Sequence, residues 1–228
     1  MAMIVHVYSS YPATSQEASR RRGLAVRTWK MQPWEERPVA DGMVRMFKDG
    51  IRSVPYLKDV FRVGCSDLTP YNIVVYTNSD ICVRSDACSV ISEVLRDRDA
   101  CYAFRRDFDR LTDVLPDSQI SNGNSYCGTD LFAFRVHWWK THGNEFPDML
   151  LGSEAWDAVM RVLVETHNPK GGQSGIADLI YHERHPSVWE DGRNRWRIDS
   201  QKHNLRLACV WLKDRGLNPE QFGIRRTT

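Results

Sequence analysis

Short apolar runs alternate with amphipathic stretches along this chain. The runs are rich in β-branched and aromatic residues, and Ile73–Tyr76 is the clearest of them. Such runs indicate strands buried on both faces, and helical stretches between them are typical of a mainly parallel sheet flanked by helices. The pattern therefore predicts an α/β fold. The expected strands are Ile4–Tyr8, Ile73–Tyr76, Cys101–Phe104 and Leu131–Phe134, and the expected helices are Ser15–Trp29, Pro55–Phe61, Cys88–Leu95, Glu154–Thr166 and Leu205–Leu212.

The segments between these elements differ in character. Residues 107–126 have little periodicity and predict a long loop, and long loops in compact domains are often functional. Residues 168–174 predict a turn-rich connector, and residues 225–228 a frayed end. No internal repeat and no linker divides the chain, so we expect one domain over residues 1–228.

Length and charge narrow the functional class. With 228 residues, of which 42% are hydrophobic, the chain can bury one core. Its 31 basic and 29 acidic residues leave a net charge of +2, so the overall charge indicates neither nucleic acid nor a membrane surface as partner. No apolar stretch reaches the roughly 20 residues that span a bilayer.

The cysteines and the N-terminal segment indicate in which cellular compartment the protein is expected. The six cysteines form no C-x-x-C pair and no zinc-ligand spacing, and we expect them to be reduced. The opening segment lacks a basic leader and carries His6 inside its apolar run, which favours a first strand over a signal peptide. These features predict a soluble, cytoplasmic protein.

A carboxylate follows the clearest buried strand, in the sequence Tyr76-Thr-Asn-Ser-Asp80. Ligands collect at the carboxyl ends of strands in open α/β sheets. A diphosphate leaving group needs its charge neutralised, and a hard cation held by carboxylates can do that. Asp80 is the candidate metal anchor, and Asn78 is a candidate helper through its amide oxygen or a bridging water. A plain polar turn after a strand remains the alternative.

A glycine and a carboxylate precede the expected strand Leu131–Phe134. Gly128 allows the backbone to approach a ligand closely, and Asp130 at a strand edge can accept hydrogen bonds from sugar hydroxyls. The alternative is that Gly128 is an ordinary turn glycine and Asp130 a solvated surface aspartate.

Two further acidic residues lie at the start of the helix expected over Glu154–Thr166. Ser153 is the expected N-cap, and Glu154 and Asp157 lie on one face near the positive end of the helix dipole. A carboxylate there can act as general base toward an acceptor hydroxyl. Acidic residues are also ordinary in a first turn, and Asp157 can pair with Arg161.

Two histidines stand three residues apart in the text Tyr181-His-Glu-Arg-His185. His182 and His185 can supply one metal ligand and one donor to a phosphate or sugar. Surface histidines without a function are the alternative.

The order of these motifs resembles that of GT-A glycosyltransferases: a metal motif after a strand, a glycine loop, an acidic helix start and a C-terminal histidine. The segments Ile73–Ile81, Gly128–Phe134 and Leu151–Asp157 look like small bacterial and phage GT-A-like proteins with an Asn-Ser-Asp-Ile core. The resemblance covers roughly residues 3 to 190.

The resemblance implies a metal-dependent glycosyltransferase that uses Mn²⁺ or Mg²⁺ and a nucleotide-sugar donor, with a UDP-sugar as the first candidate. It implies Asp80 on the metal, Asp130 near the sugar, Glu154 or Asp157 facing the acceptor, and His182 or His185 in the metal shell. Asn78 departs from the family's motif, which has a carboxylate there, and the short chain leaves little room for an acceptor domain.

Nucleotide recognition is expected where the first strand ends. Ser9 and Tyr11 are candidates for the base and ribose, and Arg20 or Arg27 for the phosphates, because a guanidinium donates paired hydrogen bonds. The consecutive arginines Arg20–Arg22 point different ways on a helix, so only one or two of them can face the site.

Other functions fit the same residues. A nucleotidyltransferase or a nucleotide-sugar hydrolase would also use a metal-held diphosphate at the sheet edge, although Ser9–Thr14 lacks the glycine-rich basic loop of nucleotidyltransferases. A GT-A-like binding domain without turnover fits the departure at Asn78.

The acceptor is open between a glycan, a small molecule and a hydroxylated DNA base. Binding DNA would require basic side chains to converge on one surface, whereas scattered solvated charge is the alternative. The near-zero net charge favours a small or glycan acceptor. The candidates for a DNA surface are Arg105, Arg106, Arg110, Arg193, Arg195, Arg197 and Lys202.

Overall fold

The computed structural model describes residues 2–10, 13, 15–40, 42–49, 52–168, 174–185 and 197–224. Its strands are β1 (Ile4–Ser9), β2 (Glu35–Val39), β3 (Met46–Asp49), β4 (Arg52–Pro55), β5 (Ile73–Thr77), β6 (Cys82–Val83), β7 (Ala100–Phe108), β8 (Asn124–Arg135) and β9 (Gly175–Glu183). Its α-helices are α1 (Gln16–Trp29), α2 (Leu57–Gly64), α3 (Ala87–Val94), α4 (Val136–His142), α5 (Trp156–Thr166) and α6 (Arg197–Lys213). Three short 3₁₀ helices are η1 (Asp117–Asn122), η2 (Gly143–Glu145) and η3 (Pro219–Phe222).

Seven of these strands form one sheet in the order β2-β1-β5-β8-β7-β9-β6, and β3 and β4 form a separate hairpin. β1 pairs in parallel with β2 and β5, and β7 pairs in parallel with β9. Only β8 and β6 run against the common direction of the other five described strands of this sheet. The predicted α/β fold with a mainly parallel sheet is confirmed.

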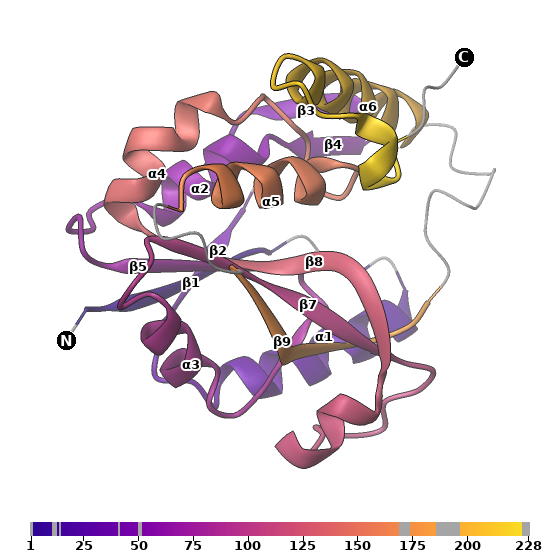
Figure 1. Ribbon diagram of the computed structural model, residues 1–228. Coiled ribbons are helices and arrows are strands. Elements are labelled where there is room, and N and C mark those ends of the chain that lie inside the picture. The colour runs from indigo at the N-terminus through magenta and orange to yellow at the C-terminus, as the bar shows by residue number, and fades with distance from the viewer. Residues whose placement is uncertain are drawn as a thin grey trace.

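Helices cover both faces of the sheet (Figure 1). α2, α4, α5 and α6 lie on one face with the β3–β4 hairpin, and α1 and α3 lie on the other. Alternate residues of a strand enter different cores: Val74 and Tyr76 pack toward α2 and α5, whereas Ile73 and Val75 pack toward α1 and α3. Burial on both faces explains why β5 is continuously apolar.

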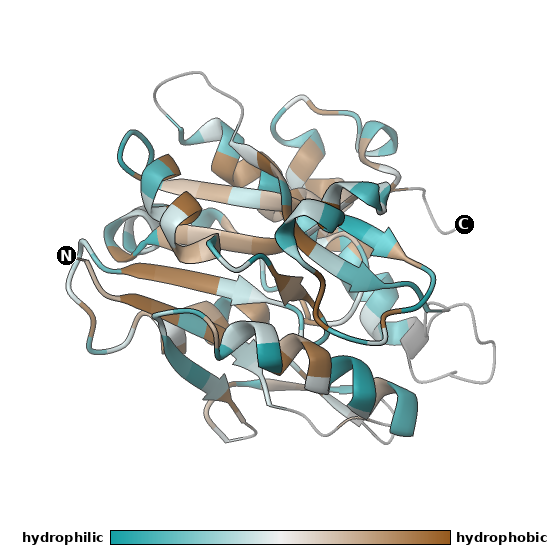
Figure 2. Ribbon diagram, turned by 90° about the horizontal axis from the view of Figure 1, so that it is seen from below, coloured by the Kyte–Doolittle hydropathy of each residue, from teal (hydrophilic) through white to brown (hydrophobic). Residues whose placement is uncertain are grey.

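The hydropathy view supports this layering. In Figure 2, hydrophobic colour concentrates on the strands, while the helices on the near side mix hydrophilic and hydrophobic residues. An amphipathic helix packs one stripe on the sheet and leaves the other in water. In α1 the buried residues are Leu24, Ala25, Thr28 and Trp29.

The two long predicted helices begin differently. Ser15 caps α1, where its side chain accepts a hydrogen bond from the backbone N–H of Ala18 at 3.1 Å. The prediction that Ser153 caps α5 is wrong, because the N-cap is Ala155, in a left-handed conformation with φ of 72°. The chain enters α5 through this turn, and Ser153 is buried beneath it.

Other predicted boundaries also need correction. The helix expected over Pro55–Phe61 begins only at Leu57, because Pro55 ends strand β4 and Tyr56 bridges to Leu150. The loop expected over 107–126 is shorter: β7 runs to Phe108, η1 occupies part of the remainder, and β8 begins at Asn124. Pairing with β8 and β9 extends β7 through residues whose polarity conceals the strand pattern.

The C-terminal part of the chain is described only in part, and several strands differ from the sequence-based expectation. The helix predicted over Leu205–Leu212 lies inside α6. Part of the connector predicted over 168–174, and all of 225–228, lie outside the described residues. Strands β2, β3, β4, β6 and β9 were not predicted. All six cysteines are free, and among the described helices none is long and apolar enough to cross a bilayer.

Gly64 tests the packing of α2 on the sheet. A Cβ there would lie 2.7 Å from Val7 Cγ2 and 3.2 Å from Val74 Cγ1. We expect Gly64→Ala to lower the free energy of unfolding by about 1–3 kcal/mol through overpacking. Gly23, inside α1, has no atom within 4 Å of the position that a Cβ would take. Gly23→Ala should stabilise by about 0.5–1 kcal/mol. Urea unfolding measures both, and equal effects would contradict this account.

Candidate functional site

A cavity of about 770 Å³ opens at the edge of the sheet where β1, β5, β7 and β9 end. Because β8 runs against β5 and β7, its first half lies at the same edge. The loop before α5 and the segment around η3 complete the wall. Of the predicted site residues, the lining contains Ser9, Asn78, Asp80, Gly128, Asp130, Glu154, Asp157, His182 and His185.

Asp80, His182 and His185 form a cluster whose potential ligand atoms all lie within 4.8 Å of one another. We call it the Asp80 cluster. The Oδ2 atom of Asp80 lies 3.1 Å from Nε2 of His185 and 3.5 Å from Nε2 of His182. Burial alone would raise the pKa of Asp80, but the two imidazoles hold it well below its usual range. The structure thus brings together three residues that the sequence suggested separately.

Asp107 stands behind His182 and was not among the predicted site residues. Its Oδ1 atom lies 3.2 Å from Nδ1 of His182, so that imidazole lies between two carboxylates. Burial opposes protonation of His182, but Asp107 and Asp80 outweigh it and raise the pKa to about 9. Sequence reasoning missed Asp107 because it assigned residues 107–126 to a loop, whereas the residue belongs to β7 and pairs in register with His182 of β9.

Arg105 joins the cluster to Asp130. Its Nε lies 2.9 Å from Asp107 Oδ1, and its Nη1 donates to Asp130 Oδ2 at 2.9 Å. The amide of Asn78 donates to Asp130 Oδ1 at 2.5 Å and accepts a hydrogen bond from the Tyr76 hydroxyl at 3.0 Å. Asn78 is therefore oriented by Tyr76 and Asp130, and it positions the Asp130 carboxylate at the cavity wall.

Gly128 is required by the packing of a neighbouring ring. A Cβ at this position would lie 2.2 Å from Cε1 of Tyr126. The Arg105 guanidinium stacks on the Tyr126 ring, with its carbon 3.9 Å from the ring centroid. A side chain at Gly128 would displace both groups, so the glycine has a packing reason as well as a place in the cavity lining.

Glu154 and Asp157 both line the cavity but differ in their surroundings. Burial raises the pKa of Asp157 to about 6, and the nearby Asp130 charge adds to the rise. Nearby backbone N–H groups of Ala158, Thr129 and Asp157 itself oppose the shift. Arg161 pairs with Glu165 at 3.9 Å, so the expected pairing of Asp157 with Arg161 is not among the described ion pairs.

The residues predicted to bind the nucleotide differ in whether they line the cavity. Ser9 lines the cavity, but Arg20 does not: it pairs with Glu17 at 2.9 Å and with Glu183. Arg22, two positions along α1, lines the cavity instead. An α-helix has 3.6 residues per turn, so consecutive side chains point in different directions. Of the three consecutive arginines, Arg22 is the one that lines the cavity. Tyr11 lies outside the described residues.

Three of the seven basic residues considered for a DNA surface have local acidic partners. Arg105 contacts Asp107 and Asp130, Arg106 contacts Asp178 at 2.5 Å, and Arg110 contacts Glu17 at 3.0 Å. These pairings leave less positive charge for a phosphate backbone. Arg193 and Arg195, together with the side chain of Arg197, lie outside the described part of the chain.

The donor chemistry of the Asp80 cluster fits a divalent transition-metal ion. One carboxylate and two imidazoles suit such an ion better than Mg²⁺, which prefers oxygen ligands. A metal-bound histidine usually donates its other ring N–H to a carboxylate, which fixes the ring and raises its basicity. Asp107 stands in that relation to His182. Space for a ligand lies directly against the cluster.

Comparisons with known proteins bear on the fold. No family model and no curated protein matches the chain. Among solved structures the chain is similar to S. aureus TarS 1-349, with a TM-score of 0.55, 10% identity, and 93% of this chain and 65% of that chain covered. The chain thus spans 65% of the length of that structure.

Two further structures match less closely. One is S. aureus TarS 1-349 in complex with UDP-GlcNAc, with a TM-score of 0.49 and 11% identity over 93% of this chain and 66% of that chain. The other is a glycosyltransferase involved in the glycosylation of the major capsid of PBCV-1, with a TM-score of 0.42 and 10% identity over 89% of this chain and 98% of that chain. Such low identity shows a similarity of fold alone.

Asp157→Asn should stabilise the protein at neutral pH. The pKa of Asp157 is raised from 3.8 to about 6, so its contribution to stability falls as pH rises through that interval. The shift corresponds to about 3 kcal/mol of unfolding free energy. Partial exposure of the Asp157 side chain and the change in its polar contacts on substitution offset part of this value. We expect a gain in unfolding free energy of about 1 kcal/mol at pH 7 and none at pH 4 in urea titrations. An equal loss at both pH values would contradict the assignment.

Proposed function

We propose that this chain is a GT-A-type glycosyltransferase that transfers a sugar from a nucleoside-diphosphate sugar to a hydroxyl acceptor. The observation that carries the proposal is the Asp80 cluster, backed by Asp107, at the sheet edge of a 770 Å³ cavity. A cavity of this size accommodates a nucleotide sugar. The similarity of the fold to that of TarS supports the proposal, because TarS forms a complex with UDP-GlcNAc.

Asp80, His182 and His185 would hold a divalent cation, for which Mn²⁺ fits the mixed oxygen and nitrogen donors better than Mg²⁺. When bound, such an ion neutralises the charge that develops on a diphosphate leaving group. Asp107 would keep the His182 ring in place by accepting a hydrogen bond from Nδ1. The cluster supports a metal-dependent enzyme.

The donor would lie across the sheet edge from β1 to β8. Ser9 at the end of β1 lines the cavity and would contact the nucleotide, and Arg22 would offer its guanidinium to phosphate. Asp130, fixed by Arg105 and Asn78, would accept hydrogen bonds from sugar hydroxyls. Because both of its oxygens are already held, Asp130 would select a sugar orientation without moving. A UDP-sugar is the first donor to test.

Glu154 is the proposed general base. It lines the cavity, and no hydrogen bond or ion pair of its carboxylate is found within the described chain. Asp157 lies in the first turn of α5, and burial and the nearby Asp130 charge raise its pKa to about 6, so we assign it a positioning role. Glu154 would take the proton of the acceptor hydroxyl as that oxygen attacks the sugar, while the bond between the sugar and the diphosphate breaks and its electron pair leaves on the nucleoside diphosphate.

The acceptor would enter beside α5 and η3. Arg161, Gln221 and Phe222 line this part of the cavity, and the Arg161 guanidinium carbon lies 5.6 Å from the Phe222 ring centroid. A flat ring and a fixed cation suit a sugar or a small hydroxylated molecule. The ion pairing of Arg105, Arg106 and Arg110 favours this class of acceptor over DNA.

Asp80→Asn should abolish metal-dependent donor binding. In a thermal-shift panel of UDP-, GDP- and dTDP-sugars with and without Mn²⁺, we expect the wild-type Tm to rise for one donor only when Mn²⁺ is present. The variant should lose that rise, because its amide binds a cation weakly. Asp214→Asn changes an exposed aspartate in the same way and should keep it. Unchanged donor binding in Asp80→Asn would refute the metal assignment.

Glu154→Gln and Asp157→Asn should separate the base from the positioning residue. We expect Glu154→Gln to lower kcat by roughly 10²–10⁴-fold while donor affinity persists, the usual effect of removing a general base. Asp157→Asn should change kcat by less than about 10-fold. Release of the nucleoside diphosphate, measured with and without candidate acceptors, gives kcat and separates transfer from hydrolysis. The reverse order of effects would exchange the two roles, and full activity in both would remove α5 from the mechanism.

A further inference from the structure

A second group of metal-ligating side chains lies in the helical layer and shares no residue with the Asp80 cluster. His142 ends α4, Glu145 ends η2, and His167 follows α5 as its C-cap. Their potential ligand atoms all lie within 4.8 Å of one another. The Oε1 atom of Glu145 lies 2.8 Å from His167 Nε2 and 3.4 Å from His142 Nδ1. We call these three residues the Glu145 cluster.

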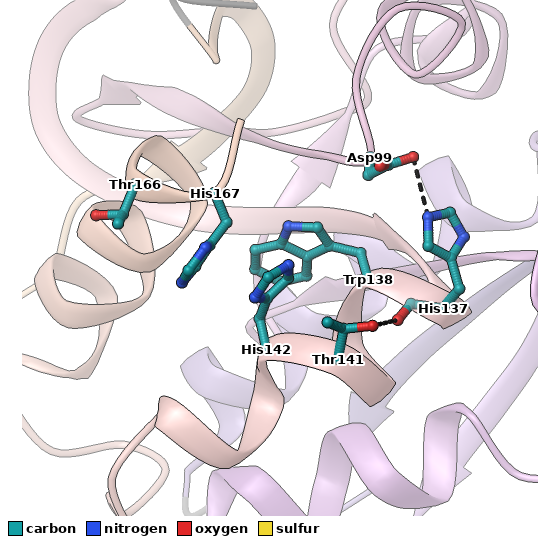
Figure 3. Close-up of a pocket in the computed structure, with 7 residues that line it drawn as sticks. All are labelled: Asp99, His137, Trp138, Thr141, His142, Thr166 and His167. Atoms are coloured by element: carbon teal, nitrogen blue, oxygen red, sulfur yellow. Dashed lines mark hydrogen bonds and ion pairs between the residues drawn. The ribbon is translucent and has the colours of Figure 1, made fainter. Parts of the chain in front are cut away.

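The two imidazoles of the cluster face each other beside a cavity of their own. Their ring centroids are 3.8 Å apart with 18° between the planes. Figure 3 shows them side by side from α4 and α5, with Trp138 next to His142. Both rings line a cavity of about 390 Å³ that has room for water or a small ligand. Each imidazole is only about a quarter exposed, at 24% and 22%.

The carboxylate of the cluster is fixed from behind. Arg215 Nη2 lies 3.1 Å from Glu145 Oε2, which leaves Oε1 turned to the imidazoles. Trp211 donates its indole N–H to the Glu145 backbone carbonyl at 2.6 Å, and the Arg215 guanidinium lies 3.7 Å from the Trp211 ring centroid. Supporting groups of this kind orient ligands in metal sites. Both partners come from α6 and the turn that follows it, so the arrangement is tertiary.

One nitrogen of the cluster lacks an aligned partner. His167 Nε2 is buried, and although it lies close to Glu145, no hydrogen bond to it is formed within the described chain. A buried polar atom without a hydrogen bond is unfavourable unless something else satisfies it. His137 lines the same cavity but has partners on both ring nitrogens: Pro70 O at 3.1 Å and Asp99 Oδ1 at 3.3 Å.

We propose that the Glu145 cluster is a binding site for Zn²⁺ or a similar divalent ion, held by His142, Glu145 and His167. Two imidazoles and one carboxylate are a common set of three protein ligands for zinc. Bonds of about 2.0–2.2 Å to a tetrahedral ion place ligand atoms about 3.3–3.6 Å apart. The separation of 3.4 Å between Glu145 and His142 lies in that range, and the separation of 2.8 Å between Glu145 and His167 is shorter than it.

The electrostatics of the cluster favour a cation. The Glu145 carboxylate places an anionic oxygen beside the two imidazoles. The cluster also lies where α4 and α5 end, and the carbonyl end of a helix carries partial negative charge. An ion there would tie α4 and η2 to α5 and, through Arg215, to α6. A fourth position remains for water from the cavity.

Zinc titration of untagged, chelator-treated protein without nucleotide tests the proposal. The parent carries Asp80→Asn and His185→Gln, so that the Asp80 cluster does not compete. We expect calorimetry to give one Zn²⁺ per chain for this parent. Adding His142→Gln and His167→Gln should weaken binding by at least 100-fold, and adding Glu145→Gln alone by at least 10-fold. Adding His137→Gln, a matched change in the same cavity, should leave the affinity unchanged.

Folding is checked separately by circular dichroism and by the Tm in chelator. If the double-histidine variant does not fold, Glu145→Gln and the ligand-field spectrum of Co²⁺ bound to the parent, which reports nitrogen and oxygen donors, carry the decision. The proposal is overturned if the parent binds no Zn²⁺, if binding survives loss of both histidines, or if His137→Gln abolishes it. Each result is independent of glycosyl transfer, because no variant is judged by activity.

Discussion

The structure around the cavity depends on the compensation of charge at Asp80. A carboxylate enclosed at the end of a buried sheet is costly unless opposite charge and hydrogen bonds surround it. His182 and His185 supply them on one side. His182 then needs Asp107, and Asp107 shares Arg105 with Asp130. The network of alternating charges therefore fixes the end of β5 against β7, β8 and β9, and it holds the cavity wall in one arrangement.

The strand order makes this network possible. β8 lies between β5 and β7 and runs against both, so the start of β8 reaches the edge where the other two strands end. β9 then adds in parallel to β7 and brings Asp107 opposite His182. Irregular register in β7 near Phe104 bends the sheet where Arg105 enters the cavity. The chemistry at this edge is thus a product of topology.

Helix α6 and the turn that follows it contribute to the large cavity and to the Glu145 cluster. Leu205 of this helix lines the large cavity, while Trp211 and the nearby Arg215 hold Glu145 at the small one. Asn204, also on α6, bonds to the backbone of Leu150 in both directions and to the carbonyl of Glu154. The loop that carries Glu154 is therefore set by a helix that follows it by about fifty residues in sequence, so packing of α6 governs the position of the proposed base.

The sequence by itself determined what depends on neighbouring residues. Continuous apolar character predicted β5, the expected helices Ser15–Trp29 and Glu154–Thr166 contain α1 and α5, and the polar residues after β5 pointed to Asp80, which lines the cavity. It did not determine that α5 begins at Trp156 with Ala155 as its N-cap, because the left-handed conformation of Ala155 overrides local capping preference. Nor did it decide which residue of the Arg20–Arg22 run lines the cavity, since that depends on how α1 is rotated on the sheet.

Only the tertiary structure decided which charges meet. His185 contacts Asp80 across 105 positions of the chain, and His182 contacts Asp107 across 75. Asp107 looked like a loop residue because the last residues of β7 carry charge and therefore lack the apolar pattern of a buried strand. The His142, Glu145 and His167 grouping likewise needs α4 and α5 to end side by side. Hydrophobic periodicity is local and survives in the sequence, whereas partners for buried charge are chosen by strand order and helix packing.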